Sequence, residues 1–384
     1  MALKVGARGH IAPFIVMDVL RAANERQAAG ADVLHLEIGQ PGTPAPAAVR
    51  AAAKRAIDEQ AIGYTDALGL PALRRRIARH YAETYGVEVD PARVAVTPGS
   101  SGGFLLAFLA AFDPGDRVAL AAPGYPAYRN ILGALGLEPV LLEAGPAERY
   151  QPTPALLERA GPLAGVIVAS PSNPTGTMLG EAEMAALADW CGQAGVRLVS
   201  DEIYHGIGYG SRAVTALERD DRAIVVNSFS KYYSMTGWRL GWLVLPEELA
   251  RPVECLGQNL FISAQSVSQY AGIAAFDCTE ELDGYVAGYA RNRALLLERL
   301  PAAGLDRLAP ADGAFYLYAD VGHLTNDSQA FCRRLLAETG VAITPGIDFD
   351  PGRGSRTVRL SFAGPEGEVA QAAERLADWL RRNR

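Results

Sequence analysis

The sequence is poor in cysteine, and its few cysteines lie far apart. It has four in 384 residues, and no two form a C-x-x-C pair: they are Cys191, Cys255, Cys278 and Cys332. Zinc sites and redox motifs use closely spaced pairs, and small disulfide-bonded folds need a denser set. We therefore expect scattered free thiols, no disulfide framework and no metal site.

Long apolar runs and an excess of positive charge are also missing. No stretch reaches the roughly 18 to 20 apolar residues of a membrane helix. The opening segment MALKVGARGHIAPFIVMDVL holds only a short apolar run, broken by Pro13 and Asp18, unlike a signal peptide. With 36 Lys and Arg against 43 Asp and Glu, the net charge is -7, which repels a phosphate backbone. We expect a cytoplasmic protein with no membrane and no nucleic-acid partner.

What is present is a globular composition and a repeated structural pattern. Hydrophobic residues make up 49% and charged residues 21% of a chain that exceeds one ordinary domain in length. From residue 93 to residue 245, short apolar runs alternate with longer amphipathic ones, as in βαβ units around a mostly parallel sheet. Strands are predicted at residues 93–97, 117–121, 139–142, 165–169, 197–200, 223–227 and 240–244.

Helices and domains follow from the same pattern. Two helices are predicted at residues 102–112 and 181–194, the second ended by Gly195 as a C-terminal cap. The last third differs, with predicted helices at 281–300, 328–338 and from Glu366, and strands at 314–319 and 357–361. A helix at 14–29 has no sheet of its own and should pack on this last third or on a partner subunit. The sequence predicts an α/β fold with a large domain, 46–275, and a smaller discontinuous α+β domain, 1–45 and 276–384.

The densest group of reactive side chains surrounds Lys231. The segment Asn227-Ser228-Phe229-Ser230-Lys231 follows a predicted strand, and Arg239 comes shortly after it. Most lysines are solvated surface residues, but ligands bind at this edge of α/β sheets, and hydroxyls with an arginine suit a phosphate. A lysine that forms a Schiff base must be neutral, so burial or nearby positive charge has to lower its pKa from about 10.4.

A turn of small residues, Thr97-Pro98-Gly99-Ser100-Ser101-Gly102-Gly103, joins a predicted strand to a predicted helix. Its backbone N–H groups and the helix dipole favour a bound anion. The same residues match G-x-S-x-G, the nucleophile elbow of α/β-hydrolases, with Ser101 as nucleophile and His205 or His323 as base. That alternative leaves Lys231 unexplained.

Three further polar residues stand at or within predicted strands. Two prolines around Asn173, in Ser170-Pro171-Ser172-Asn173-Pro174-Thr175-Gly176, make a rigid loop that aims its side chain. Asp201 ends a buried run and needs a cationic partner unless it faces water. Arg359, within an apolar strand, suits a bidentate grip on a carboxylate, the alternative being an edge-strand arginine facing solvent.

In this order, the segments resemble the fold-type-I aminotransferases of class I/II, which depend on pyridoxal phosphate. The resemblance covers nearly the whole chain, from Glu37-Ile38-Gly39-Gln40-Pro41 to the Arg359 strand, and rests on Ser-Asn-Pro-Thr-Gly, Asp-Glu-x-Tyr and Ser-Phe-Ser-Lys. It implies a large domain with a mostly parallel seven-stranded sheet, pyridoxal 5′-phosphate as the cofactor, and a homodimer with shared active sites.

The resemblance also implies roles for single residues. Lys231 would bind the cofactor covalently and then act as general base. Asp201 would face the pyridine nitrogen and keep the ring protonated. Asn173 and Tyr204 would hydrogen-bond the ring hydroxyl, and Tyr125, in Pro123-Gly124-Tyr125-Pro126, would stack on the ring.

The phosphate and the substrate would have their own groups. The phosphate would be held by Ser100, Ser101, Ser228 and Arg239, with Tyr64 reaching across from a second subunit. Arg359 would bind the substrate α-carboxylate, with Gly39 and Asn173 nearby. Trp238 is expected to be a core residue.

These roles imply a ping-pong aminotransferase that moves an amino group from an L-amino acid to a 2-oxo acid. The phosphate loop Gly99-Ser100-Ser101-Gly102 holds no basic residue, whereas some bacterial relatives that prefer dicarboxylic substrates carry a lysine there. We therefore favour a neutral or aromatic donor over aspartate, with 2-oxoglutarate or pyruvate as acceptor. A carbon–sulfur β-lyase on the same scaffold is the alternative.

Overall fold

Seven strands form the main sheet in the computed structural model, which describes residues 3–383. Their order is β2-β8-β7-β6-β5-β3-β4, with parallel pairing from β7 to β4 and β8 antiparallel to both of its neighbours. The strands are β2 (Val94–Thr97), β3 (Arg117–Ala122), β4 (Glu138–Glu143), β5 (Gly165–Ala169), β6 (Arg197–Asp201), β7 (Ile224–Ser228) and β8 (Gly241–Val244). The predicted strands and the mostly parallel seven-stranded sheet are confirmed.

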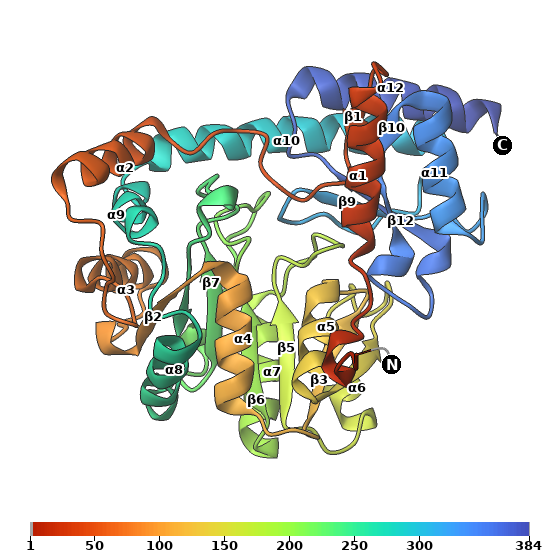
Figure 1. The fold of residues 1–384 in the computed structure, drawn as a ribbon. Helices are drawn as coiled ribbons and strands as arrows, with labels where there is room; N and C mark the ends of the chain where they lie inside the picture. Colours follow the sequence, from red (N-terminus) through yellow and green to blue (C-terminus); the bar gives the residue numbers. More distant parts are fainter. Residues whose placement is uncertain (1–2, 384) are drawn as a thin grey trace.

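Helices cover both faces of this sheet (Figure 1), which is why its central strands are almost continuously apolar. Neighbouring residues of β7 show the two faces, because Val225 belongs to one hydrophobic cluster and Val226 to another. The helices around the sheet are α2 (Ala47–Glu59), α3 (Pro71–Tyr85), α4 (Gly99–Ala111), α5 (Pro126–Leu135), α6 (Pro154–Arg159), α7 (Glu181–Ala194), α8 (Glu247–Leu260) and α9 (Ser266–Ala275).

Two of these helices had been expected from the sequence. Helix α7 has the predicted bounds, and Gly195 ends it in the left-handed conformation with φ of 67°. Helix α4 begins at Gly99, before the predicted start at Gly102. Ser100 and Ser101 therefore lie in the first turn of the helix and not in a loop ahead of it.

The C-terminal part of the chain forms a second, smaller core with the N-terminal segment (Figure 1). A three-stranded sheet has the order β11-β12-β9, and β1 pairs with β10 in parallel. The elements are β1 (Leu34–His35), β9 (Tyr316–Asp320), β10 (Val341–Ala342), β11 (Thr344–Pro345), β12 (Thr357–Ser361), α10 (Thr279–Ala302), α11 (Ser328–Thr339) and α12 (Glu366–Arg382). A short 3-10 helix, η5 (Gly346–Asp348), follows β11.

Helix α1 (Ile15–Ala28) lies against these C-terminal strands, drawn as the red helix in Figure 1. Its buried Ala23 packs in a small cluster with Val33, Leu336 and Ala342. A helix that has no sheet of its own thus buries its apolar face on elements from the other end of the chain. None of the described helices is long and apolar enough to cross a membrane.

Candidate active site

A cavity of about 480 Å³ lies at the carboxyl ends of the parallel strands, where β5, β6 and β7 end. Residues of the main sheet, of α1 and of the C-terminal strands line it together. Ten of the residues predicted from the sequence are among the lining: Gly39, Ser100, Ser101, Tyr125, Asn173, Asp201, Tyr204, Lys231, Arg239 and Arg359. Chain segments far apart in sequence therefore meet at one site. In open α/β sheets, ligands bind at this edge, outside the carboxyl ends of the strands.

Lys231 follows β7 and points its amine at the N-terminal segment. Its Nζ donates a hydrogen bond to the carbonyl oxygen of Gly39 at 2.5 Å and lies 5.8 Å from the centroid of the Tyr204 ring. Burial and the positive charge of Arg359 together lower the pKa of Lys231 to about 8, although the negative charge of Asp201 opposes the shift. A useful fraction of this amine is therefore neutral near pH 7 to 8, as imine formation requires.

Asp201 ends β6 and is only 4% exposed. Its Oδ1 accepts the backbone N–H of Ile203 at 3.1 Å, and its Oδ2 accepts a hydrogen bond from the hydroxyl of Tyr128. Burial raises the pKa of Asp201 to about 6, and the hydrogen bonds from Tyr128 and Ile203 oppose that rise. A buried carboxylate held this way is oriented to receive one more proton donor or cation from the cavity.

Arg359 lies on the central strand of the small sheet and is 2% exposed. Its guanidinium carbon sits 4.5 Å from the Tyr316 ring centroid and 4.8 Å from that of Phe349. Nη1 donates to Asn173 Oδ1 at 3.0 Å, and Nη2 donates to the Glu37 carbonyl oxygen. The alternative of an edge-strand arginine facing solvent is wrong.

The segment before Gly39 connects these two cations. The carbonyl oxygen of Glu37 accepts a hydrogen bond from Arg359, and the carbonyl oxygen of Gly39 accepts one from Lys231. The carboxylate Oε1 of Glu37 is hydrogen-bonded to His35 Nδ1 at 2.8 Å. A Cβ at Gly39 would stand 2.1 Å from the Tyr316 hydroxyl, so only glycine fits there. Tyr316 in turn shares a 2.6 Å hydrogen bond with Tyr204.

The turn at the start of α4 provides an anion-binding surface. Gly99 has φ of +71°, and a Cβ there would stand 2.6 Å from Arg239 Nη2. Ser100 and Ser101 are in the first helical turn, where backbone N–H groups lack partners within the helix. The guanidinium of Arg239 and the positive end of the helix dipole thus face the same place.

Two residues expected at the site are not among the residues that line this cavity. Ser228 is 1% exposed, and its hydroxyl lies within hydrogen-bond distance of Ser230 Oγ, at 2.9 Å, and of the Leu240 carbonyl oxygen, at 3.1 Å. Ser230 lines the cavity instead. Tyr64 is 83% exposed and lies outside the lining of its own chain's cavity.

Several lining residues carried no signal that could be recognised in the sequence. Tyr128, which holds Asp201, stands in the first turn of α5, and Tyr316 begins the apolar strand β9. The remaining ones are Phe14, Val16, Met17, Ile38, Gln40, Phe104, Ala169, Ile203, Ser230 and Thr236. Ile38, Gln40, Ile203 and Ser230 stood inside segments singled out in the sequence, but none of them was assigned a role there.

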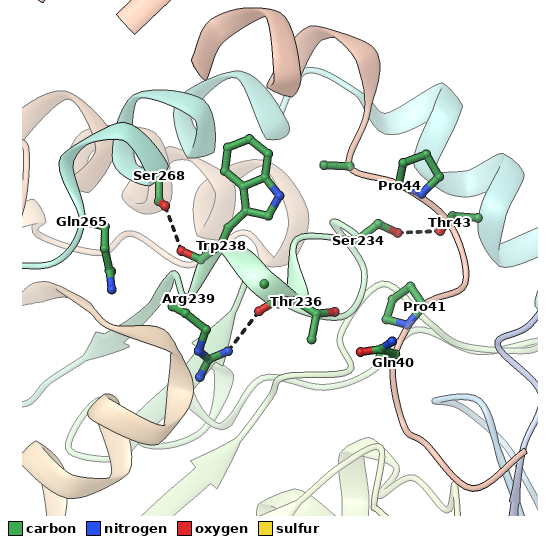
Figure 2. A pocket seen from close by; sticks show the side chains of 12 residues that line it. Gln40, Pro41, Thr43, Pro44, Ser234, Thr236, Trp238, Arg239, Gln265 and Ser268 are labelled. Atoms are coloured by element: carbon green, nitrogen blue, oxygen red, sulfur yellow. Dashed lines mark hydrogen bonds between the residues drawn. The ribbon is translucent and has the colours of Figure 1, made fainter. Parts of the chain in front are cut away.

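A second, more open pocket of about 650 Å³ adjoins the first and shares Gln40, Thr236 and Arg239 with it (Figure 2). Trp238 lines this pocket and is only partly buried. Trp238 nevertheless packs against the main hydrophobic core, so it lies at the edge of that core and not inside it. Its backbone carbonyl accepts a 2.8 Å hydrogen bond from Ser268, drawn as a dashed line in Figure 2.

The hydrolase alternative lacks its base. The two ring nitrogens of His205 are taken by the Tyr85 hydroxyl at 2.7 Å and the Ser170 carbonyl oxygen at 3.0 Å. His323 is exposed and hydrogen-bonded to the Gly304 carbonyl oxygen. Neither histidine lines the cavity that contains Ser101, so the hydrolase interpretation is wrong.

The charges in the cavity fit a phosphorylated cofactor together with a carboxylate substrate. Among residues 3–383, the basic side chains that line it are those of Lys231, Arg239 and Arg359, and Asp201 is the acidic one. Arg359 Nε is buried and lacks a hydrogen-bond partner within the described residues, which leaves it able to donate to a bound anion. The site therefore offers an amine for an aldehyde, an anion-binding turn, a carboxylate for a ring nitrogen and a second anion-binding cation.

Comparison with known proteins agrees with this geometry. The family model described as aminotransferase class I and II matches residues 31–376. A valine–pyruvate aminotransferase of Mycobacterium tuberculosis is 54% identical over 385 residues, which cover 99% of each chain. A crystal structure of an aminotransferase from Mycobacterium tuberculosis has a TM-score of 0.97 at 54% identity, covering 99% of this chain and all of that one. An aspartate aminotransferase from Thermus thermophilus, solved with maleate, has a TM-score of 0.92 at 31% identity, covering 98% and 100%.

Proposed function

This chain belongs to the class I and II aminotransferase family, and from that membership we propose that it transfers the amino group of an L-amino acid with an apolar side chain to pyruvate. Transfer of an amino group to a 2-oxo acid is its activity. The choice of donor and acceptor, the contacts to the cofactor and the sharing of the site between subunits are the proposal. The charge of the cavity and the apolar character of its wall support it.

The proposed cofactor is pyridoxal 5′-phosphate. When bound, it supplies an aldehyde that takes the amino group and a ring that accepts electrons. Lys231 would hold it covalently, Asp201 would pair with its ring nitrogen, and the α4 turn with Arg239 would take its phosphate. Tyr125, Asn173 and Tyr204 complete the proposed ring contacts, and Ser230 replaces Ser228 as the hydroxyl facing the cavity.

Lys231 is the proposed base for the proton that moves during transfer. Its lowered pKa of about 8 would leave the free amine able to take a proton and return it at neutral pH. Its hydrogen bond to Gly39 keeps the amine at the side of the cavity where Arg359 is held by Glu37. A carboxylate bound to Arg359 would thus place its α-carbon within reach of the lysine.

The observation that carries the choice of substrate is the number of cations. The three basic side chains that line the cavity are each assigned, Lys231 to the aldehyde, Arg239 to the phosphate and Arg359 to the α-carboxylate. A second carboxylate, as in aspartate or 2-oxoglutarate, would meet no further basic side chain of residues 3–383 in this lining and would be buried unpaired at a high cost. The rest of the wall includes the apolar Phe14, Val16 and Ile38. The name of the Mycobacterium tuberculosis relative, which gives valine and pyruvate, agrees with this choice.

A homodimer with shared active sites is also proposed. Tyr64 is 83% exposed, and large apolar side chains in its surroundings along the chain are exposed as well, including Ile57 and Ile62. Exposed apolar groups of this kind mark an interaction surface. A second copy of the chain would bury them and could bring its Tyr64 to the phosphate end of the cavity.

A donor and acceptor panel tests the proposed substrates. Purified enzyme with pyridoxal 5′-phosphate is given valine, alanine, phenylalanine or aspartate, each with pyruvate or 2-oxoglutarate, except alanine, which is paired with 2-oxoglutarate alone. We expect kcat/KM for valine with pyruvate to exceed that for aspartate with either acceptor by at least about a hundredfold, the scale of one unpaired buried charge. Equal or better use of aspartate would refute the proposed specificity. Ammonia and pyruvate release from cystathionine, measured in parallel, tests the β-lyase alternative.

A further inference from the structure

The first residues of α1 form part of the cavity wall. Phe14, Val16 and Met17 line it, although none of them was assigned a role at the site from the sequence. The Phe14 ring packs edge-on against Tyr125, with centroids 5.7 Å apart and planes at 79°. This part of the wall is therefore apolar and is built by the start of a helix.

This helix start has no cap of its own. The N-cap position is Phe14, whose side chain cannot accept a hydrogen bond, so the first N–H groups of α1 need an acceptor from elsewhere. Asp348 supplies it from the far end of the chain. Its Oδ1 accepts the N–H of Ile15 at 3.3 Å and its Oδ2 accepts the N–H of Val16 at 3.0 Å.

Asp348 is itself held firmly. It is fully buried in η5, and its backbone carbonyl accepts a 2.7 Å hydrogen bond from Arg129 Nη2. The next residue, Phe349, stacks on the guanidinium of Arg359. Two neighbouring residues thus hold two parts of the proposed substrate site. Phe349 contacts Arg359, the group proposed to bind the carboxylate, and Asp348 holds the start of α1, which forms the apolar wall.

We propose that Asp348 is a positioning residue for substrate specificity: by holding the first turn of α1, it keeps Phe14, Val16 and Met17 against the substrate side chain and so selects branched apolar donors over small ones. This proposal rests on the proposed function, because it assumes an apolar donor. A branched side chain gains from each methyl group that contacts the wall, whereas the methyl group of alanine is too short to gain as much. A less firmly held wall should therefore lower kcat/KM for valine more than kcat/KM for alanine.

The test is the ratio of kcat/KM for valine to that for alanine, both with glyoxylate as acceptor, in holoenzyme carrying Asp348→Asn. The amide keeps the shape of the side chain but removes one acceptor and its charge. We expect the ratio to fall by about tenfold, the discrimination that one methylene supplies in an apolar pocket. Hydrogen exchange at the amides of Ile15 and Val16 should accelerate in the same variant.

Asp327→Asn is the matched control. Asp327 is an exposed N-cap residue whose Oδ1 accepts the N–H of Ala330 at 2.9 Å, far from the cavity lining. It loses the same kind of contact and should leave the ratio unchanged. An equal fall in both variants would refute the proposal, as would an unchanged ratio in Asp348→Asn, or unchanged exchange at the start of α1.

Val16→Ala keeps the proposal testable if Asp348→Asn does not fold. It shortens the wall with Asp348 intact and should lower the same ratio, and an unchanged ratio would refute the role of the wall. Where both single variants fold, combining them should give less than the product of their separate effects, because Asp348 acts through the wall. The donor and acceptor panel on the wild-type enzyme comes first. If the wild-type enzyme uses no apolar donor, the proposed function is refuted. If it does, and Asp348→Asn has the same valine-to-alanine ratio of kcat/KM, only the role of Asp348 is refuted.

Discussion

Arg359 donates a hydrogen bond of 3.0 Å to Asn173, across 186 positions of sequence. Arg359 comes from the central strand of the small sheet, and Asn173 from the loop that follows β5 of the main sheet. The bond joins the group proposed to bind the substrate carboxylate to one proposed to contact the cofactor ring. The relative position of these two groups in the active site is therefore set by both sheets together.

Arg359→Lys should raise KM for the amino donor and lower kcat/KM by about a hundredfold or more. Lysine cannot make the forked contact of a guanidinium, and it cannot stack between Tyr316 and Phe349 in the same way. Arg356→Lys, an exposed position near the start of the same strand, is the control and should keep normal kinetics. A wild-type KM in Arg359→Lys would show that the carboxylate is bound elsewhere.

Tyr128→Phe should shift the acid limb of kcat/KM to higher pH. The Tyr128 hydroxyl stabilises the charged form of Asp201 and opposes the rise of its pKa caused by burial. Without that bond the pKa rises further, so the carboxylate loses its charge at a higher pH as acid is added. A hydrogen bond to a charged group is worth about 1.5 to 3 kcal/mol, which corresponds to a shift of about 1 pH unit or more.

The control for that pH profile is Tyr318→Phe. Tyr318 is also a buried tyrosine with one hydrogen bond, 2.7 Å to Thr357 Oγ1, but it does not line the cavity. Its loss should leave the acid limb in place. Superimposable profiles for wild type and Tyr128→Phe would remove Tyr128 from the site.

His35→Gln should destabilise the fold at low pH and have little effect at high pH. The hydrogen bond to Glu37 raises the pKa of His35 above its ordinary value of 6.5, burial opposes the rise, and Glu368 adds to it. Such a histidine stabilises the folded state fully below pH 6.5, and this contribution is lost as pH rises through the raised pKa. The gap in Tm between variant and wild type should be widest at pH 6 and close by pH 9.

The size of that effect is small, about 1 kcal/mol or less for a partly exposed pair. Calorimetry of the holoenzyme across pH measures it, with His10→Gln as the control at an exposed position. A gap in Tm that widens with pH would contradict the assignment of charge to the pair.

Mixing two inactive variants tests the shared active site. Lys231→Ala should abolish turnover while cofactor still binds noncovalently, and Tyr64→Ala should weaken cofactor binding in the partner's site. After exchange of subunits in equal amounts, half the dimers contain one native site, so about a quarter of wild-type activity should return. Lys231→Ala mixed with Asp201→Ala should recover nothing, because both residues line the same cavity of one chain. Failure of the first mixture to recover activity, with exchange verified, would exclude Tyr64 from the partner's site.

The sequence predicted the fold well where local and tertiary preferences agree. Helix α7 ends where Gly195 permits the left-handed cap, and β12 has the predicted bounds because its apolar alternation admits no other register. The prediction placed the start of α4 too late, because Gly99, Ser100 and Ser101 have poor helix propensity. Gly99 lets the turn approach the guanidinium of Arg239 closely, and no local signal in the sequence reveals that approach.

The site was predictable where a motif carries the chemistry, and not where a residue acts through a distant partner. Lys231, Asp201 and Asn173 each end or follow a strand within a recognisable segment. Tyr128 had no such signal, because its partner Asp201 lies 73 positions away. Asp348 is the same kind of case, since nothing near it in sequence identifies the start of α1 as its partner.

The pairing of β1 with β10 has a consequence for synthesis of the protein. Leu34 pairs with Val341, and the carbonyl oxygen of Leu36 accepts the N–H of Ser361, so the earliest-made strand stays without partners until almost the whole polypeptide has left the ribosome. The main sheet, whose strands lie between those two regions, can form before then. Arg359 of β12, which lines the cavity, is therefore added to that cavity only when nearly the whole chain has been made.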